Sequence, residues 1–249
     1  MRFYLNLKYE GKKVCQYTID RLLGEGRYGL CFLARSENGS TVVIKKYKKG
    51  LRKNNIPDCI DEAVILSQLK DERIPEFLGV INEKGFYGFV LEYKNGCTVK
   101  DLLFKHSHKF SGEEFYHIGI QLIDIIKYLH DNGIVHRDIR IPNVVIDQGK
   151  VYLIDFGLAR WAEKTAPYDL DFTYLGDFFL YLLYSSFEKT TKRKPWAQEL
   201  PWYDEISLTQ EQKVFLRRLF GLETQYESIH DIETDFVKVF MNVKQNNSV

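Results

Sequence analysis

Three polar residues near the middle of the chain, Asp138, Asn143 and Asp155, have the types and spacing that metal-assisted phosphoryl transfer needs. One carboxylate can orient a hydroxyl group for attack. An amide oxygen and a second carboxylate can hold Mg²⁺ over the phosphates of a nucleotide. His136-Arg137 precedes the first Asp, and Phe156-Gly157 follows the second. The joint spacing, rather than either short motif alone, indicates a phosphoryl-transfer site.

Short apolar runs around these residues predict the elements that position them. Ile134-Val135 leads into the first Asp, and runs at 144–146 and 151–154 flank the turn residues 147–150. Runs rich in β-branched residues on both sides of a Gly-containing turn are typical of a hairpin. The sequence therefore predicts strand and turn structure from 134 to 154.

A glycine-rich segment upstream, residues 24–29, has the pattern G-x-G-x-x-G. Dinucleotide-binding loops share this pattern but open a helix. Here alternating apolar residues at 30–34 predict a strand, so the loop is expected at a hairpin tip, where glycines let backbone N–H groups approach phosphates closely. The expected phosphate contacts are Gly24, Glu25, Gly26 and Gly29. Tyr28 either caps the tip or is an ordinary exposed aromatic residue.

Two further residues complete this candidate site. Lys45 ends the apolar run Val42-Val43-Ile44, where it is suited to pair with the α- and β-phosphates, although a solvated strand end has the same pattern. Glu62 follows seventeen residues later in a helix predicted to begin near Pro57. Because Asp61 and Glu62 are adjacent, only one can face Lys45, and the inward position of Leu66 one turn later favours Glu62.

These motifs occur in the order found in protein kinases, and the chain resembles that family over roughly residues 17 to 240. The resemblance implies an α+β, two-lobed fold that forms one kinase domain. Residues 1–94 would form an antiparallel sheet with one main helix, and residues 95–249 a mostly helical lobe. ATP and Mg²⁺ (or Mn²⁺) would bind between the lobes.

The resemblance also assigns roles to single residues. Asp138 would orient the acceptor hydroxyl, Arg140 would assist at the γ-phosphate, and Asn143 and Asp155 would bind the metal. Residues 91–96 would form the hinge that meets adenine. The remaining nucleotide contacts would be Cys31, Val43, Glu92, Tyr93 and Val145, with Leu91 at the back of the pocket. Val43 replaces the small Ala that is usual over adenine, which should narrow the pocket.

Other residues are expected to support the site. Asp171 would either hydrogen-bond the catalytic-loop backbone from beneath or cap a helix, and Asp101 would either meet the ribose or cap a helix. His136 and Phe156 are expected to stack with Leu66. A buried helix is predicted from Phe115 to Asn132, ending at Gly133.

The chain departs from the family after Asp-Phe-Gly. The activation segment is short and lacks Ala-Pro-Glu, and Gln225 occupies the position of the Arg that usually pairs with that Glu. This absence resembles compact bacterial and archaeal kinases. Arg137 would bind the phosphate group of a phosphorylated Thr165 or Tyr168, with Thr165 favoured. The alternative is that the enzyme is constitutively assembled.

Arg140 stands where Ser/Thr kinases usually have Lys, and the following Pro142 is closer to the Ser/Thr type. We therefore expect transfer to Ser/Thr hydroxyls, with autophosphorylation open. A small-molecule phosphotransferase of related fold is the alternative, because Ala-Pro-Glu normally shapes the peptide platform. A nucleotide-binding pseudokinase is disfavoured, since every catalytic residue type is present.

Composition and charge agree with a folded enzyme. The 249 residues are 45% hydrophobic, and no apolar run reaches the length of about 18 residues that a membrane helix needs. Residues 1–8 read as a strand rather than a signal peptide. Four scattered cysteines, Cys15, Cys31, Cys59 and Cys97, indicate buried or partly buried thiols in a reducing cytoplasm, not zinc or disulfides.

Charge is uneven along the chain. Residues 1–94 hold 17 Lys and Arg against 12 Asp and Glu. Residues 95–249 hold 18 Lys and Arg against 22 Asp and Glu. The excess lies in the basic stretch 45–53. That stretch is either a solvated connector or a contact for a polyanion such as nucleic acid or a membrane surface. The substrate protein and the oligomeric state are not indicated by the sequence.

Overall fold

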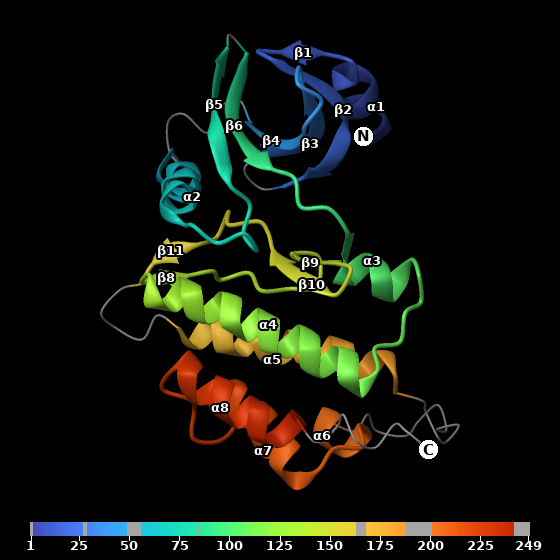
Figure 1. The fold of residues 1–249 in the computed structure, drawn as a ribbon, viewed down its shortest axis with the longest axis vertical. Helices are drawn as coiled ribbons and strands as arrows, with labels where there is room; N and C mark the ends of the chain where they lie inside the picture. Colours follow the sequence, from blue (N-terminus) through green and yellow to red (C-terminus); the bar gives the residue numbers. More distant parts are fainter. Residues whose placement is uncertain are drawn as a thin grey trace. The chain divides into compact units, whose positions relative to one another are not determined.

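The computed structural model describes residues 2–26, 29–48, 56–83, 85–162, 168–187 and 201–241. The chain forms two compact units (Figure 1). The N-terminal unit comprises Met1–Asn95 with Phe156–Ala159, and the C-terminal unit comprises Gly96–Asp155 with Arg160–Val249. Together they contain the α and β elements expected of an α+β fold.

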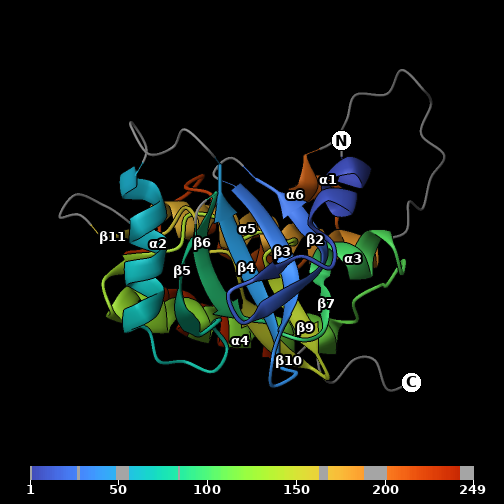
Figure 2. The same ribbon diagram turned by 90° about the horizontal axis from the view of Figure 1, so that it is seen from above.

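The N-terminal unit is built on a six-stranded antiparallel sheet with the strand order β1-β2-β3-β4-β6-β5. Helices α1 and α2 lie at opposite ends of this sheet in both ribbon views (Figures 1 and 2). The elements are α1 (Arg2–Tyr9), β1 (Lys13–Val14), β2 (Tyr17–Glu25), β3 (Gly29–Ser36), β4 (Thr41–Tyr47), α2 (Ile56–Gln68), β5 (Phe77–Glu83) and β6 (Phe86–Glu92).

The prediction of a strand at residues 1–8 was wrong, because Arg2–Tyr9 forms helix α1. The apolar residues alternate along the segment and so imitate a strand. However, Leu5 and Tyr9 are also four residues apart, which places them on one face of a helix. Both pack against the buried cluster of the sheet, which includes Phe32 and Phe86. Tertiary packing therefore decided the conformation of this segment.

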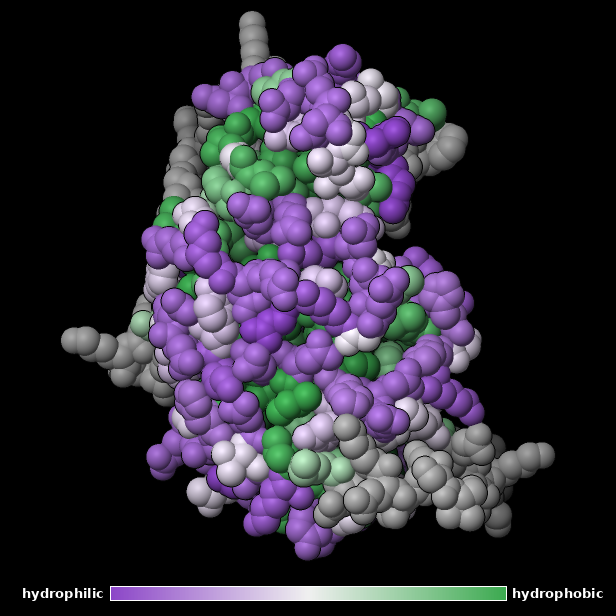
Figure 3. All heavy atoms as spheres, in the orientation of Figure 1, coloured by the Kyte–Doolittle hydropathy of each residue, from purple (hydrophilic) through white to green (hydrophobic). Residues whose placement is uncertain are grey.

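The C-terminal unit is mostly helical. Its strands are β7 (Cys97–Thr98), β8 (Ile134–Val135), β9 (Val144–Asp147), β10 (Lys150–Leu153) and β11 (Arg160–Trp161). Its helices are α3 (Val99–Phe104), α4 (Gly112–Asp131), α5 (Asp169–Ser185), α6 (Trp202–Glu205), α7 (Gln210–Leu219) and α8 (Ile229–Phe240). The face of this unit in Figure 3 is largely hydrophilic, as expected of helices that bury one side.

Helix α4 shows how local sequence and packing agree. Ser111 and Glu114 form a capping box at its start, and Gly133 follows its end with φ of +69°. Inside the unit, the rings of Phe115 and Phe236 pack 5.9 Å apart. A Cβ at Gly119 would lie 2.3 Å from the Phe236 ring, so this position requires glycine. The helix predicted for residues 115–132 is confirmed.

Several other predictions are also confirmed. The glycine-rich segment joins the antiparallel strands β2 and β3, and the segment 144–154 forms the hairpin β9–β10. The helix predicted near Pro57 is α2.

No helix in the described part of the chain is long and apolar enough to cross a membrane. The expected burial of the thiols was partly wrong: of the three cysteines whose side chains are described, Cys15 and Cys97 are exposed and Cys31 is half-buried.

Candidate active site

Three expected nucleotide-contacting residues lie in one row across the sheet of the N-terminal unit. Gly24 on β2 is the register partner of Cys31 on β3, and Cys31 is the partner of Lys45 on β4. Two residues earlier on β4, Val43 pairs with Leu91 on β6. Since side chains alternate along a strand, Val43 and Lys45 share one face. The strand register thus brings the predicted residues of this unit together.

Lys45 forms an ion pair with Glu62 of α2. The Glu62 side chain is only 7% exposed and that of Lys45 is 20% exposed, so the pair is shielded from water. A shielded pair has a fixed geometry, because breaking it would leave a buried charge. The choice of Glu62 over Asp61 as the partner of Lys45 is confirmed.

The glycine-rich loop contains glycines of two kinds. A Cβ at Gly29 would lie 2.0 Å from the carbonyl oxygen of Lys46, so close strand packing requires glycine there. A Cβ at Gly24 or Gly26 would meet no described atom within 4 Å. The described packing does not require glycine at these two positions. The close approach of a ligand is therefore a reason for glycine to occupy them. Tyr28 lies outside the described residues.

The expected hinge contains a buried cation that the sequence reading missed. The Lys94 side chain is 5% exposed, and its ammonium donates to the carbonyl of Glu72 at 2.7 Å and to Glu92 Oε2 at 2.6 Å. Glu92 also accepts from the backbone N–H of Glu76 at 3.2 Å. The Glu92 side chain is therefore occupied, and a nucleotide contact at Glu92 would use its backbone. The sequence Glu92-Tyr93-Lys94 offered a signal, a cation two residues after an acid.

In the C-terminal unit, Asp138 lies at the centre of a compact polar cluster. Asn143 Nδ2 donates to the Asp138 carbonyl at 2.9 Å and to its Oδ2 at 2.8 Å. Arg140 approaches the same carboxylate with Nε at 2.6 Å from Oδ1 and Nη2 at 2.9 Å from Oδ2. This pairing with Asp138 raises the pKa of the Arg140 guanidinium. The contacts from Asn143 and Arg140 thus fix the orientation of the Asp138 carboxylate.

The β9–β10 hairpin brings the two expected metal ligands to one end. Asn143 directly precedes β9, and its carbonyl accepts from Ile154 N–H at 2.8 Å. Asp155 is the next residue after Ile154. It has φ of +65°, which is unusual for a residue with a Cβ. Such backbone conformations cost about 1–3 kcal/mol and cluster at functional sites.

Asp171 supports the backbone that leads into Asp138. It is fully buried in α5, and it accepts from the N–H groups of His136 at 2.9 Å and Arg137 at 2.7 Å. The first of its two expected roles is therefore confirmed, and α5 begins earlier, at Asp169. His130 Nε2 lies 3.0 Å from Asp171 Oδ2. No spacing in the sequence signalled this contact between residues 41 positions apart.

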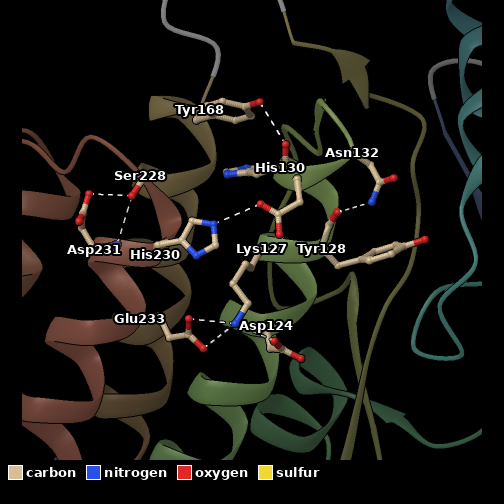
Figure 4. A network of polar contacts seen from close by, with 11 residues as sticks. Asp124, Lys127, Tyr128, His130, Asn132, Tyr168, Ser228, His230, Asp231 and Glu233 are labelled. Carbon is tan, nitrogen blue, oxygen red and sulfur yellow. Dashed lines mark hydrogen bonds and ion pairs between the residues drawn. The ribbon is translucent and has the colours of Figure 1, made fainter.

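The end of α4 is held by polar contacts on both sides (Figure 4). Tyr168 donates its hydroxyl to the His130 carbonyl at 3.2 Å. Towards α8, Lys127 pairs with Glu233 at 2.7 Å, and His230 lies 3.2 Å from Asp131. These contacts fix the C-terminal turn of α4, which carries His130 towards Asp171.

His136 is fully buried beside the catalytic loop. Burial lowers the pKa of its imidazole, and this effect outweighs the opposing fields of Asp171, Asp155 and Asp138. The backbone N–H of Asp138 lies 3.3 Å from its Nδ1. An imidazole in this position acts as a neutral support for the loop.

The structure leaves several predictions untested. Val145 is buried in the C-terminal unit, apart in the chain from the other expected nucleotide contacts. Thr165 and most of the basic stretch 45–53 lie outside the described residues. His136, Phe156 and Leu66 are all buried, and their mutual stacking stays a prediction. Asp101 is not the cap of α3, which is Thr98; instead it pairs with Lys105 at 2.9 Å.

The described residues contain no group of three or more His, Cys, Asp or Glu side chains suited to a metal ion. Mg²⁺ in nucleotide-dependent enzymes is commonly held through one or two carboxylates together with substrate phosphates. The pair Asn143 and Asp155 has that chemistry. These residues therefore fit a metal that arrives with a nucleotide rather than one held by a protein cage.

Comparison with known proteins identifies the family. Residues 17–179 match the model of the protein kinase domain. The probable serine/threonine-protein kinase YbdM of Bacillus subtilis (strain 168) is 30% identical over 237 residues, covering 92% of this chain and 91% of the relative.

Two eukaryotic relatives match a smaller part. Cyclin-dependent kinase F-3 of Oryza sativa subsp. japonica is 29% identical over 61% of this chain and 35% of its own length. Serine/threonine-protein kinase PKH2 of Candida albicans is 30% identical over 61% of this chain and 17% of its own length. The motif order, the contacts at Asp138 and Lys45, and these matches show that the chain belongs to the protein kinase family.

Proposed function

We propose that this protein kinase transfers the γ-phosphoryl group of ATP to Ser or Thr hydroxyls of proteins, with Asp138 as the residue that orients the acceptor. The observation that carries the proposal is the cluster in which Asn143 and Arg140 hold both oxygens of the Asp138 carboxylate. A carboxylate held in this way can accept a hydrogen bond from an incoming hydroxyl in one defined direction.

The acceptor oxygen attacks the γ-phosphorus while the bond from that phosphorus to the β–γ bridging oxygen breaks. The hydroxyl proton passes to Asp138, and ADP leaves with the bridging oxygen. Asp138 orients the hydroxyl before transfer, which is the main contribution of such a residue when the transition state is loose. Arg140, beside it, stabilises negative charge on the transferred group.

Lys45 and the glycine-rich loop bind the phosphates in this proposal. Lys45 supplies a cation to the α- and β-phosphates, and its ion pair with Glu62 sets the direction of its side chain. A phosphate can approach the backbone at Gly24 and Gly26, because the described structure leaves open space where Cβ atoms would lie, although the Gly26 N–H itself donates to the Gly29 carbonyl at 2.9 Å. Cys31, Val43, Glu92, Tyr93 and Val145 are proposed as contacts for the rest of the nucleotide.

Asn143 and Asp155 are proposed to hold Mg²⁺. When bound, Mg²⁺ would neutralise charge on the nucleotide phosphates. The hairpin β9–β10 fixes the positions of both ligands. Asn143 uses its Nδ2 for the hydrogen bonds to Asp138, which leaves the Oδ1 of Asn143 available. An amide with its nitrogen engaged presents its oxygen, the atom that Mg²⁺ prefers.

The preference for Ser and Thr is supported by Arg140 and Pro142 in the catalytic loop and by the description of the Bacillus subtilis relative as a probable serine/threonine-protein kinase. A small-molecule acceptor is the second candidate, favoured by the absence of Ala-Pro-Glu after Asp155. Autophosphorylation at Thr165 is a further proposal within the first candidate.

Transfer of labelled phosphate from [γ-³²P]ATP and Mg²⁺ to casein or myelin basic protein tests this function. The wild-type protein is expected to label the acceptor, itself, or both, and Asp138→Asn is expected to abolish labelling. Asp147→Asn, in the nearby hairpin, removes an equal charge outside the cluster and should keep activity. Undiminished labelling by Asp138→Asn would refute the assigned role, and ATP turnover without labelled protein would favour a small-molecule acceptor.

A further inference from the structure

The N-terminal unit contains a pocket whose lining residues, apart from Glu25, have no role in the proposed reaction. It has a volume of about 450 Å³, within the range of small-molecule sites. Its walls come from α1, the segment after it, the ends of β2 and β4, and the starts of β3 and β6. The lining residues are Leu5, Lys8, Tyr9, Lys12, Glu25, Leu30, Lys46, Tyr47, Lys48 and Gly85.

This pocket lies on the face of the sheet opposite to the expected phosphate-binding face. Lys45 and Lys46 are consecutive on β4, so their side chains point to opposite faces. Lys45 meets Glu62 of α2, whereas the Lys46 ammonium lies 5.1 Å from the Phe86 ring and 5.8 Å from the Tyr9 ring. The two lysines therefore serve separate sites.

Cations gather in this pocket. The ammonium groups of Lys8 and Lys12 lie 5.5 Å and 6.0 Å from the centroid of the Tyr9 ring, so with Lys46 three cations surround one ring. Cation–π attraction draws each ammonium group to the ring, but it does not remove the mutual repulsion of the three cations. Lys46 is also only 7% exposed, which limits screening by water.

The described lining carries four lysines and a single carboxylate, Glu25. Glu25 is already paired with Lys48 at 3.0 Å. The pocket thus has an excess of positive charge and a wall of tyrosine and leucine side chains. An anion with several charges would be attracted by this excess of positive charge, and an organic portion could pack against the apolar wall.

We propose that this pocket binds a small organic anion carrying two or more phosphate groups. Two of these lysines, Lys46 and Lys48, belong to the basic stretch 45–53, for which the sequence left open a solvated connector or a contact for a polyanion such as nucleic acid or a membrane surface. The pocket favours a compact ligand instead, because its cations converge on the Tyr9 ring rather than spreading along a strand.

The pocket also connects to the glycine-rich loop. Glu25 is the second residue of that loop, and its pairing with Lys48 joins the end of β2 to the chain just after β4. A phosphate that draws Lys48 away would release Glu25. This consequence rests on the proposed function, and it predicts that ligand binding changes the KM for ATP while leaving the Asp138 cluster intact.

Calorimetric titration with inorganic pyrophosphate tests the binding site directly. The titration is run without Mg²⁺ and in the presence of a non-hydrolysable ATP analogue, so that phosphate binding at the glycine-rich loop is suppressed. The double variant Lys8→Gln/Lys12→Gln should raise the Kd for pyrophosphate about tenfold or more, as expected for losing a charge-assisted hydrogen bond. Both side chains are exposed, so the fold should be retained.

The double variant Lys13→Gln/Lys70→Gln is the matched control. It removes the same charge from exposed lysines of the same unit that do not line the pocket. It should change the Kd less than twofold. Equal weakening in both double variants would show a general charge effect and would overturn the proposal. Binding of heparin, but not of pyrophosphate, to the wild-type protein would also overturn it. Because calorimetry needs no phosphate transfer, a failure of the proposed kinase function would leave this result interpretable.

Discussion

Asp171 holds the backbone of Arg137: its Oδ1 accepts a hydrogen bond of 2.7 Å from the Arg137 N–H, although the two residues are 34 positions apart. Arg137 has φ of +65°, in the left-handed region. Keeping a residue with a Cβ there costs about 1–3 kcal/mol, so the conformation persists because surrounding contacts enforce it. Helix α5 thus supports the loop that ends in Asp138.

Asp171→Ala is expected to destabilise the protein by about 2–6 kcal/mol, because it leaves two backbone N–H groups without an acceptor at about 1–3 kcal/mol each. Urea unfolding followed by circular dichroism measures this change. Asp169→Ala, in the first turn of the same helix, is the control and should cost at most about 1 kcal/mol. Equal losses in the two variants would mean that Asp171 contributes only its charge at the helix start.

Glu62→Gln is expected to lower the rate of phosphate transfer about a hundredfold, because Lys45 loses the ion pair that sets its position. Steady-state assays at varied ATP concentration measure the effect. The neighbouring variant Asp61→Asn should stay within about twofold of the wild type. If Asp61→Asn is the more damaging change, the assignment of Glu62 as the functional partner of Lys45 is wrong.

Arg140→Met should reduce transfer about 100–1000-fold, the usual cost of removing one donor that stabilises transition-state charge. Arg140→Lys keeps the cation but loses the two-point contact with Asp138, so an intermediate rate is expected. Single-turnover kinetics separate this loss from weaker nucleotide binding. Full activity in Arg140→Met would show that the ion pair with Asp138 is only structural.

The buried His136 predicts a pH dependence of stability. Its pKa is lowered in the folded protein by burial, whereas in the unfolded chain a histidine titrates near pH 6.5. Protons therefore bind the unfolded chain more readily. The stabilising contribution is complete above about pH 6.5, declines as the pH falls below that value, and is fully lost once the pH reaches the folded-state pKa.

Urea unfolding at several pH values between about 5 and 7.5 measures this dependence. His136→Asn should flatten the fall in stability at acid pH, because asparagine does not titrate. The control His106→Asn, at an exposed position, should leave the slope as in the wild type. An unchanged slope in His136→Asn would assign the acid sensitivity to other groups.

The residues that could be predicted from the sequence are those whose positions follow from local patterns. The hairpin between Asn143 and Asp155 and the start of α2 near Pro57 depend on turn residues and apolar spacing, which act over a few residues. The choice of Glu62 also followed from one helical turn, since Leu66 had to face inward. In each case the side-chain direction is fixed by the element that carries it.

The features that could not be predicted depend on partners far apart in the chain. Helix α1 has an alternating pattern, and only the packing of Tyr9 against Phe32 selects the helix. The contact of His130 with Asp171 and that of Lys94 with the Glu72 carbonyl likewise join separate segments. A single sequence carries no periodic signal for such contacts, because they depend on the tertiary fold.

The most direct test of the proposed function is to locate the transferred phosphate by mass spectrometry after the purified protein has reacted with Mg²⁺, ATP and myelin basic protein. Phosphoserine or phosphothreonine is expected on the acceptor or on the protein itself, and both should be lost in Asp138→Asn while Asp147→Asn keeps them. Phosphate found only on tyrosine, or on protein treated with Asp138→Asn at the wild-type level, would contradict the proposed Ser/Thr protein kinase acting through Asp138.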